Sequence, residues 1–129
     1  MDAQMVLGVA PTSDISRARS FYLDTLGLSE FEGPSVPESL LVQSGNSAFL
    51  VYQTQAKSGD ATVLSFLVKD LDKVMKDLRD KGVKFEDYDL PGLKTENGVA
   101  EDPQMRAAWF KDPDGNVIAI GEAAFDLGL

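Results

Sequence analysis

The chain has 129 residues, of which 43% are hydrophobic and 26% charged, so it is long enough for one domain with its own core and too apolar to be disordered. It contains neither histidine nor cysteine, which excludes disulfides and thiol nucleophiles and removes the commonest metal ligand and general base. Its net charge of −9 argues against nucleic acid as a partner, because an acidic chain repels phosphates.

The hydropathy pattern argues against a membrane partner. No apolar run approaches the ~18 residues that a membrane span requires. The opening segment, MDAQMVLGVAPTSD, lacks the basic region and long apolar core of a signal peptide. We therefore expect a cytoplasmic protein.

The first predicted element is an apolar strand over residues 5–10 that ends at Pro11. Ser13 and Asp14 then offer N-cap oxygens for a helix, and Gly27 is placed to end it. Between them, apolar side chains recur at helical spacing: Ile15, Ala18, Tyr22 and Leu26.

A hairpin follows this helix. Its predicted strands cover residues 39–42 and 48–52, joined by a turn at Ser44-Gly45-Asn46. One more short strand fits near residues 28–31. The first half therefore reads as strand, helix and two or three further strands.

The second half repeats this order. A strand over residues 62–68 precedes a helix that Asp70 caps and Gly82 ends. We then expect a strand over residues 83–88. The final hairpin pairs residues 105–111 with residues 116–120 around Asp112-Pro113-Asp114-Gly115, which has proline and glycine at the positions a tight turn favours.

The spacing of these landmarks indicates a tandem duplication. The caps Asp14 and Asp70 are 56 positions apart, whereas the turn glycines Gly45 and Gly115 are 70 apart. The extra residues of the second half fall in residues 90–104, which have loop composition and are predicted to form a lid. We expect one domain, 1–129, made of two units at about 5–54 and 62–122.

Two segments carry a family resemblance. DISRARSFYLDTLGL (14–28) and AAWFKDPDGNVIAIGE (107–122), at this separation, resemble the vicinal-oxygen-chelate superfamily, which includes glyoxalase I, extradiol dioxygenases and bleomycin resistance proteins. The resemblance implies an α+β fold in which tandem βαβββ units form a curled mixed sheet around a cleft, with helices on the outer face. It also implies a homodimer, because the family usually pairs two chains around its clefts.

The resemblance also implies where metal ligands would stand. Enzymes of the superfamily hold a divalent metal with His or Gln, Glu, His and Glu side chains from four strands. The matching positions here are all apolar: Leu7, Phe49, Val63 and Ala119. We therefore expect neither a metal nor another cofactor, which argues against glyoxalase, dioxygenase and epimerase activity.

The final hairpin supplies the most distinctive candidate binding residue. If Asp112 faces Asn116, Trp109 stands opposite Ala119 and Ala107 opposite Gly121, all on one sheet face. Trp109 is the only tryptophan and has small neighbours. The expected ligand-binding residues are Trp109, Phe49, Val51, Ser65, Ala119, Leu7, Val63, Ala107 and Met105. The other face is expected to pack under the helices: Leu64, Phe66, Val68, Phe110, Ile118 and Ile120.

The charged residues near the lid give weaker evidence for a binding role than Trp109 does. Glu96, Glu101 and Asp102 are read as solvated loop charges, although they could meet a cationic ligand. Arg106 could bind a carboxylate, but a surface role is favoured. We identify no catalytic residue.

Three functions fit this pattern. The favoured one is a metal-independent small-molecule-binding protein, resembling bleomycin resistance proteins, whose acidity and Trp109 suit a cationic or aromatic ligand. The alternative is a cofactor-free lyase or isomerase that uses a carboxylate, Tyr52 or Tyr88 as its base. The third is a structural or regulatory protein whose cleft is filled by Trp109, Phe49 and Met105. Whether the chain is an enzyme stays open, with binding preferred.

Overall fold

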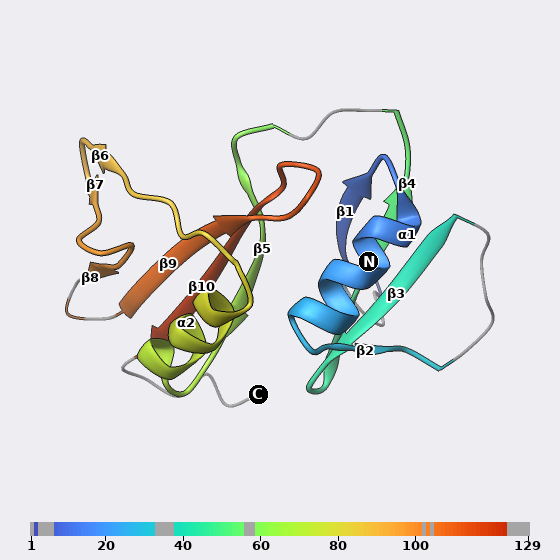
Figure 1. Cartoon of the computed structure of the whole chain (residues 1–129), viewed down its shortest axis with the longest axis horizontal. Helices are drawn as coiled ribbons and strands as arrows, with labels where there is room; N and C mark the ends of the chain where they lie inside the picture. The colour runs from blue at the N-terminus through green and yellow to red at the C-terminus, as the bar shows by residue number, and fades with distance from the viewer. Residues whose placement is uncertain are drawn as a thin grey trace. The chain divides into compact units, whose positions relative to one another are not determined.

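The computed structural model describes residues 2, 7–32, 38–55, 59–101, 103 and 105–123. The chain divides into two compact units (Figure 1). Unit 1 comprises Met1–Val63 together with Asp112–Asn116, and unit 2 comprises Leu64–Lys111 together with Val117–Leu129. Each unit combines a helix with a mixed sheet, so the predicted α+β class is confirmed.

Unit 1 contains a four-stranded sheet in the order β1-β4-β3-β2, in which only the β1–β4 pair is parallel. The β3–β4 hairpin closes on Gly45-Asn46, with Ser44 opposite Ser47, as the sequence predicted. Gly45 has φ +58, which glycine adopts without strain. The strands are β1 (Gly8–Thr12), β2 (Ser29–Glu30), β3 (Ser39–Ser44) and β4 (Ser47–Gln53).

Strand β1 extends further than predicted. It continues through Pro11 to Thr12, and the expected start at Met5 lies outside the described residues. The expectation that Pro11 ends the strand is wrong because β1 is an edge strand of this sheet. At an edge, a residue without an N–H group is tolerated.

The helix of unit 1 begins where predicted. The Asp14 carboxylate accepts hydrogen bonds from the backbone N–H groups of Ser16 and Arg17, which caps α1 (Ile15–Arg19). The helix continues with π geometry as η1 (Ser20–Thr25), and Gly27 follows at φ +72. Helix α1 lies against β3 and β4 (Figure 1).

Unit 2 contains a second four-stranded sheet, in the order β5-β10-β9-β8. The Asp70 side chain accepts from the Lys73 N–H and caps α2 (Leu71–Asp80), and Gly82 follows the helix at φ +91. Leu71, Met75 and Leu78 form the buried side of α2. The long strands are β5 (Thr62–Leu67), β9 (Met105–Lys111) and β10 (Val117–Ala123).

The predicted strand over residues 83–88 is wrong. This segment touches β9 through a single Phe85–Phe110 bridge and a hydrogen bond from the Glu86 N–H to the Trp109 carbonyl at 2.8 Å. The chain then leaves the sheet because the Asp87 carboxylate binds the Thr95 hydroxyl and the Gly98 N–H, both at 2.9 Å.

The predicted lid, residues 90–104, is also more regular than its composition suggested. It contains three short strands, and the isolated bridge between Glu96 and Val99 closes a turn at Asn97-Gly98. Asp102 and Gln104 lie outside the described residues. The short strands are β6 (Asp89–Leu90), β7 (Leu93–Lys94) and β8 (Ala100–Glu101).

Candidate functional site

The β9–β10 hairpin places Trp109 as the sequence predicted. Trp109 pairs with Ala119, and Ala107 pairs with Gly121. Because side chains alternate along a strand, these positions share one face of the sheet with Met105, and we call it the Trp109 face. The opposite face is buried, with Phe110, Ile118 and Ile120 at most 3% exposed.

The Trp109 face is aromatic and partly open. Trp109 is half-buried, and the Tyr88 ring meets it edge-on at a centroid distance of 5.7 Å. The Met105 Cε methyl lies 3.0 Å from the point where a Cβ on Gly121 would stand, so Met105 packs closely over the glycine. Leu67 is 50% exposed, and its Cδ2 lies 3.7 Å from the same point. Such a face can stack on a flat ring or hold a cation against the indole.

Phe49 and Val51, which the sequence predicts to point into a ligand cleft, are not exposed on an open face of the sheet. Both are buried, and the Phe49 ring meets Tyr22 of η1 edge-on at 5.4 Å. Phe49 therefore lies on the side of the sheet that packs against η1, and the role of both residues as ligand contacts stays a prediction. In β4 they alternate with Ala48 and Leu50, which take the other face of the sheet.

The remaining predicted ligand-binding residues lie in or beside the first strand of each half. Leu7 precedes β1 and is 39% exposed. Val63 and Ser65 lie two residues apart in β5, so they share a face, on which Val63 is half-buried and Ser65 exposed. Their role as ligand contacts stays a prediction.

The donor set does not fit the divalent metal that the resemblance associates with this fold. Leu7, Val63 and Ala119 carry only carbon, and Phe49 points into the core. Ala48 and Leu50, which take the opposite face at the Phe49 position, are apolar as well. Among the described residues there is also no group of three or more His, Cys, Asp or Glu side chains able to hold a metal ion.

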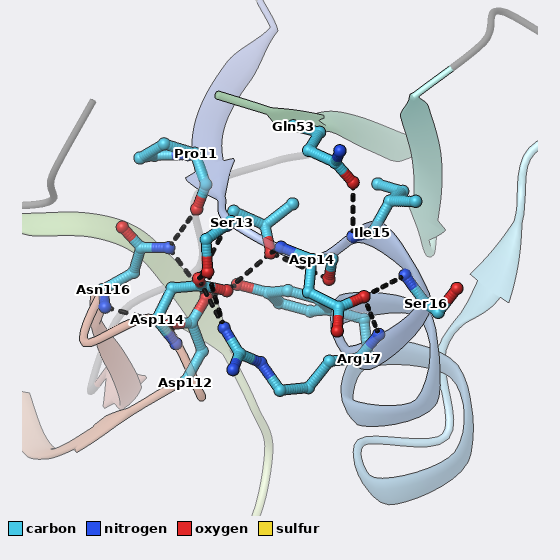
Figure 2. A network of polar contacts seen from close by, with 12 residues as sticks. Pro11, Ser13, Asp14, Ile15, Ser16, Arg17, Gln53, Asp112, Asp114 and Asn116 are labelled. Atoms are coloured by element: carbon cyan, nitrogen blue, oxygen red, sulfur yellow. Dashed lines mark hydrogen bonds and ion pairs between the residues drawn. The ribbon is translucent and has the colours of Figure 1, made fainter. Parts of the chain in front are cut away.

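The Asp112–Asn116 turn carries a polar network within unit 1, shown in Figure 2. The Asp114 carboxylate accepts from the Thr12 hydroxyl at 2.6 Å, from the Ser13 backbone N–H at 2.7 Å and from the Ser13 hydroxyl at 2.8 Å. Arg17 donates to the same carboxylate at 2.7 Å. Ser13, expected as a helix cap, thus binds the turn instead.

The other carboxylate of this turn is buried. Asp112 accepts from the Tyr22 hydroxyl and from the Asn116 side-chain amide, both at 2.8 Å. The same amide donates to the Pro11 carbonyl at 2.7 Å. The turn is therefore bound both to β1 and to the helix of unit 1.

The network changes the pKa values of two of its members, Tyr22 and Asp114. Burial, followed by the charge of Asp112 and its hydrogen bond, raises the pKa of Tyr22 well above its ordinary value. Burial opposes ionisation of Asp114, but the hydrogen bonds from Thr12 and Ser13 and the Arg17 charge outweigh it and lower the pKa of Asp114. The sequence predicted a structural role for this motif only in closing the hairpin. The missed signal is Asp114 itself, since a turn of this kind requires no carboxylate at that position.

Arg106 binds a carboxylate of its own chain. It donates to both carboxylate oxygens of Asp72, at 2.9 and 3.3 Å, and its Nε lies 3.8 Å from Glu101. The hydrogen bond and charge of Arg106 lower the pKa of Asp72. Arg106 alternates with Trp109 onto the opposite face of β9, so these charges lie apart from the Trp109 face.

A family model and one sequence relative match most of the chain. A family model described as the Glyoxalase/Bleomycin resistance protein/Dioxygenase superfamily matches residues 5–120. The chain is also 30% identical over 122 residues to the uncharacterized protein YraH of Bacillus subtilis (strain 168), covering 84% of this chain and 89% of that protein.

Two solved structures share the fold. TnmS3, an antibiotic binding protein from Streptomyces sp. CB03234, is 22% identical with a TM-score of 0.69, over 96% of this chain and 100% of that one. Lactoylglutathione lyase from Agrobacterium tumefaciens is 17% identical with a TM-score of 0.69, over 94% and 95% of the two chains.

Among the residues that the structure describes, no helix has the length and hydropathy that a membrane span requires.

Proposed function

Because the chain belongs to the Glyoxalase/Bleomycin resistance protein/Dioxygenase superfamily, we propose that it is a metal-independent small-molecule-binding protein whose Trp109 face holds an aromatic or cationic ligand. The single observation that supports this best is the half-buried Trp109, with Tyr88 at its edge and Ala119 opposite. An indole between small neighbours leaves room for a ring to stack.

Metal independence rests on the chemistry of the side chains. A divalent ion needs several oxygen, nitrogen or sulfur donors at one point. The residues at the family's ligand positions supply none from their side chains. Ligand binding is then left to aromatic and apolar contacts and to charge.

The ligand class follows from charge and from the aromatic face. A net charge of −9 attracts cations over long range, and an indole face binds them at short range. The structural neighbour named as an antibiotic binding protein supports a binding role for this fold. By resemblance to the family, we also propose that the protein is a homodimer. We propose a cytoplasmic location as well.

A cofactor-free lyase or isomerase is the second candidate. It is favoured by Tyr88, whose ring lies at the edge of Trp109, and by the neighbour named as a lactoylglutathione lyase. We take the Tyr88 hydroxyl as the base in this candidate, because the Tyr88 ring contacts Trp109. Tyr88→Phe separates the candidates, because it would abolish turnover in an enzyme while a stacking site retains most of its affinity.

The binding proposal can be tested by the fluorescence emission of Trp109, because Trp109 is the only tryptophan of the chain. We would titrate the protein with N-methylquinolinium, neutral 2-methylnaphthalene and tetramethylammonium. We expect saturable quenching, with the aromatic cation binding most tightly. Trp109→Ala, followed by calorimetry, should weaken binding of the aromatic cation at least about fivefold.

The control is Phe31→Ala, which removes an aromatic side chain that is 44% exposed in unit 1. It should leave binding unchanged, and addition of EDTA should have no effect on either protein. Equal affinities of the Trp109→Ala variant and the parent would contradict the proposal. So would a loss of the fold in that variant, which would identify Trp109 as core.

A further inference from the structure

Unit 2 has a hollow on the side of β9 opposite to Trp109. It measures about 700 Å³ and lies between α2, the segment from β7 to β8, and Arg106 of β9. We call it the α2 pocket. Its lining residues are Asp72, Met75, Lys76, Arg79, Asp80, Lys94, Glu96, Asn97, Val99, Glu101 and Arg106.

One wall of the α2 pocket is a firmly held turn. Gly98 has φ +81, and a Cβ there would stand 3.1 Å from Phe85 Cβ and 3.3 Å from Arg79 Nη2. Asp87 accepts the Gly98 N–H at 2.9 Å. Only glycine allows the turn to approach the helix this closely, so the wall has a defined position.

Arg79 joins this turn to the helix. Its Nη2 donates to the Asn97 carbonyl at 2.9 Å, and its guanidinium lies 5.2 Å from the centre of the Phe85 ring. These contacts fix the group without neutralising it, because a carbonyl and a ring carry no full negative charge. A positioned cation therefore lines the pocket.

The other charges divide into paired and unpaired groups. Lys76 pairs with Asp80 at 2.9 Å, and Arg106 pairs with Asp72. Within the residues that the structure describes, Lys94 and Glu96 form no ion pair, and both line the pocket. An ammonium and a carboxylate are thus available in one hollow, together with the guanidinium of Arg79.

This combination selects a ligand that carries both signs of charge. A simple anion would meet Glu96 and Glu101, and a simple cation would meet Arg79 and Lys94, so each would meet repulsion as well as attraction. We propose that the α2 pocket binds a small zwitterion of the amino-acid or short-peptide class. Arg79 and Lys94 receive its carboxylate, and Glu96 receives its ammonium group. This site is independent of the Trp109 face.

The test is an NMR titration of ¹⁵N-labelled protein with three matched probes. Alanyl-alanine carries both charges, N-acetylalanine only the carboxylate, and alaninamide only the ammonium. We expect saturable shifts of the Lys94, Asn97 and Gly98 amides with alanyl-alanine. Each single-charge probe should bind about tenfold more weakly, because a charge-assisted contact is lost.

Variants locate the site. Lys94→Gln and Glu96→Gln change exposed side chains. Each should weaken the binding of alanyl-alanine about tenfold and leave the fold intact. Lys73→Gln removes an exposed charge from α2 outside the pocket and should have no effect. No saturable shift with alanyl-alanine, or equal binding of a single-charge probe, would overturn the proposal. Neither result would bear on binding at Trp109, which is measured by emission.

Discussion

The hydroxyl of Tyr22 donates a hydrogen bond of 2.8 Å to the carboxylate of Asp112, joining residues 90 positions apart in the sequence. The same ring meets Phe21 and Phe49 edge-on at 5.3 and 5.4 Å, and its side chain is fully buried. One side chain thus fills the core of unit 1 with its ring and binds the Asp112–Asn116 turn with its hydroxyl.

Removing that hydroxyl should destabilise the protein. In Tyr22→Phe the ring packing is kept, but the buried Asp112 carboxylate loses one donor. We expect the free energy of unfolding to fall by about 1.5–3 kcal/mol, the usual range for a hydrogen bond to a charged group. Urea denaturation, followed by circular dichroism, measures this difference.

The matched control is Tyr52→Phe, which removes a hydroxyl from a half-buried tyrosine of β4. We expect a change within about 0.5 kcal/mol, as for positions away from buried networks. Equal effects of the two substitutions would show that the Asp112 contact adds nothing to stability.

Asp114 should make stability depend on pH in the acid range. Its pKa is lowered in the folded protein relative to its ordinary value of 3.8. The carboxylate therefore stabilises the fold fully above that value, and the stabilisation is lost as the pH falls through the lower folded pKa. Asp114→Asn should be less stable than the parent at neutral pH, and the difference should narrow below about pH 4.

Denaturation at a series of pH values tests this, with Asp24→Asn as a variant of equal charge change at an exposed position. The Asp24 variant should follow the parent at every pH. A difference between the parent and Asp114→Asn that stays constant down to strongly acid pH would show that Asp114 titrates alike in both states.

The register of the last hairpin could be predicted because turn chemistry and strand alternation are local. Asp112 and Asn116 define the pairing, and Trp109 then falls opposite Ala119. The helix caps at Asp14 and Asp70 were predictable for the same reason. Each depends on residues a few positions apart.

The orientation of Phe49 could not be predicted from the repeat alone. The first hairpin closes on two residues between Ser44 and Ser47, whereas the second places five between Lys111 and Val117. Because the two turns differ by an odd number of residues, the strand after each turn presents the opposite set of side chains to the helix. Phe49 and Ala119 therefore occupy matching positions in the repeat but lie on opposite faces of their sheets. Bonds such as Tyr22 to Asp112 were missed because no local pattern links them.

The proposed metal independence predicts the result of elemental analysis. After dialysis, the purified protein should contain no stoichiometric nickel, zinc, iron or manganese. Its melting temperature should not rise when zinc is added, because a ligand that binds only the folded state stabilises it. One equivalent of any of these metals, or a rise in melting temperature with zinc concentration, would contradict the proposal.

Gly121 offers a way to alter the Trp109 face with little effect on the fold. A Cβ at this position would lie 3.0 Å from Met105 Cε, the end of a flexible side chain, which can move aside. We expect Gly121→Ala to cost about 1 kcal/mol of stability and to change Trp109 emission, because Met105 shares that face. Gly59→Ala, where a Cβ meets nothing within 4 Å, is the control and should leave emission unchanged. A loss of about 3 kcal/mol or more would mean that Met105 is held in place and that the Trp109 face is packed as a core.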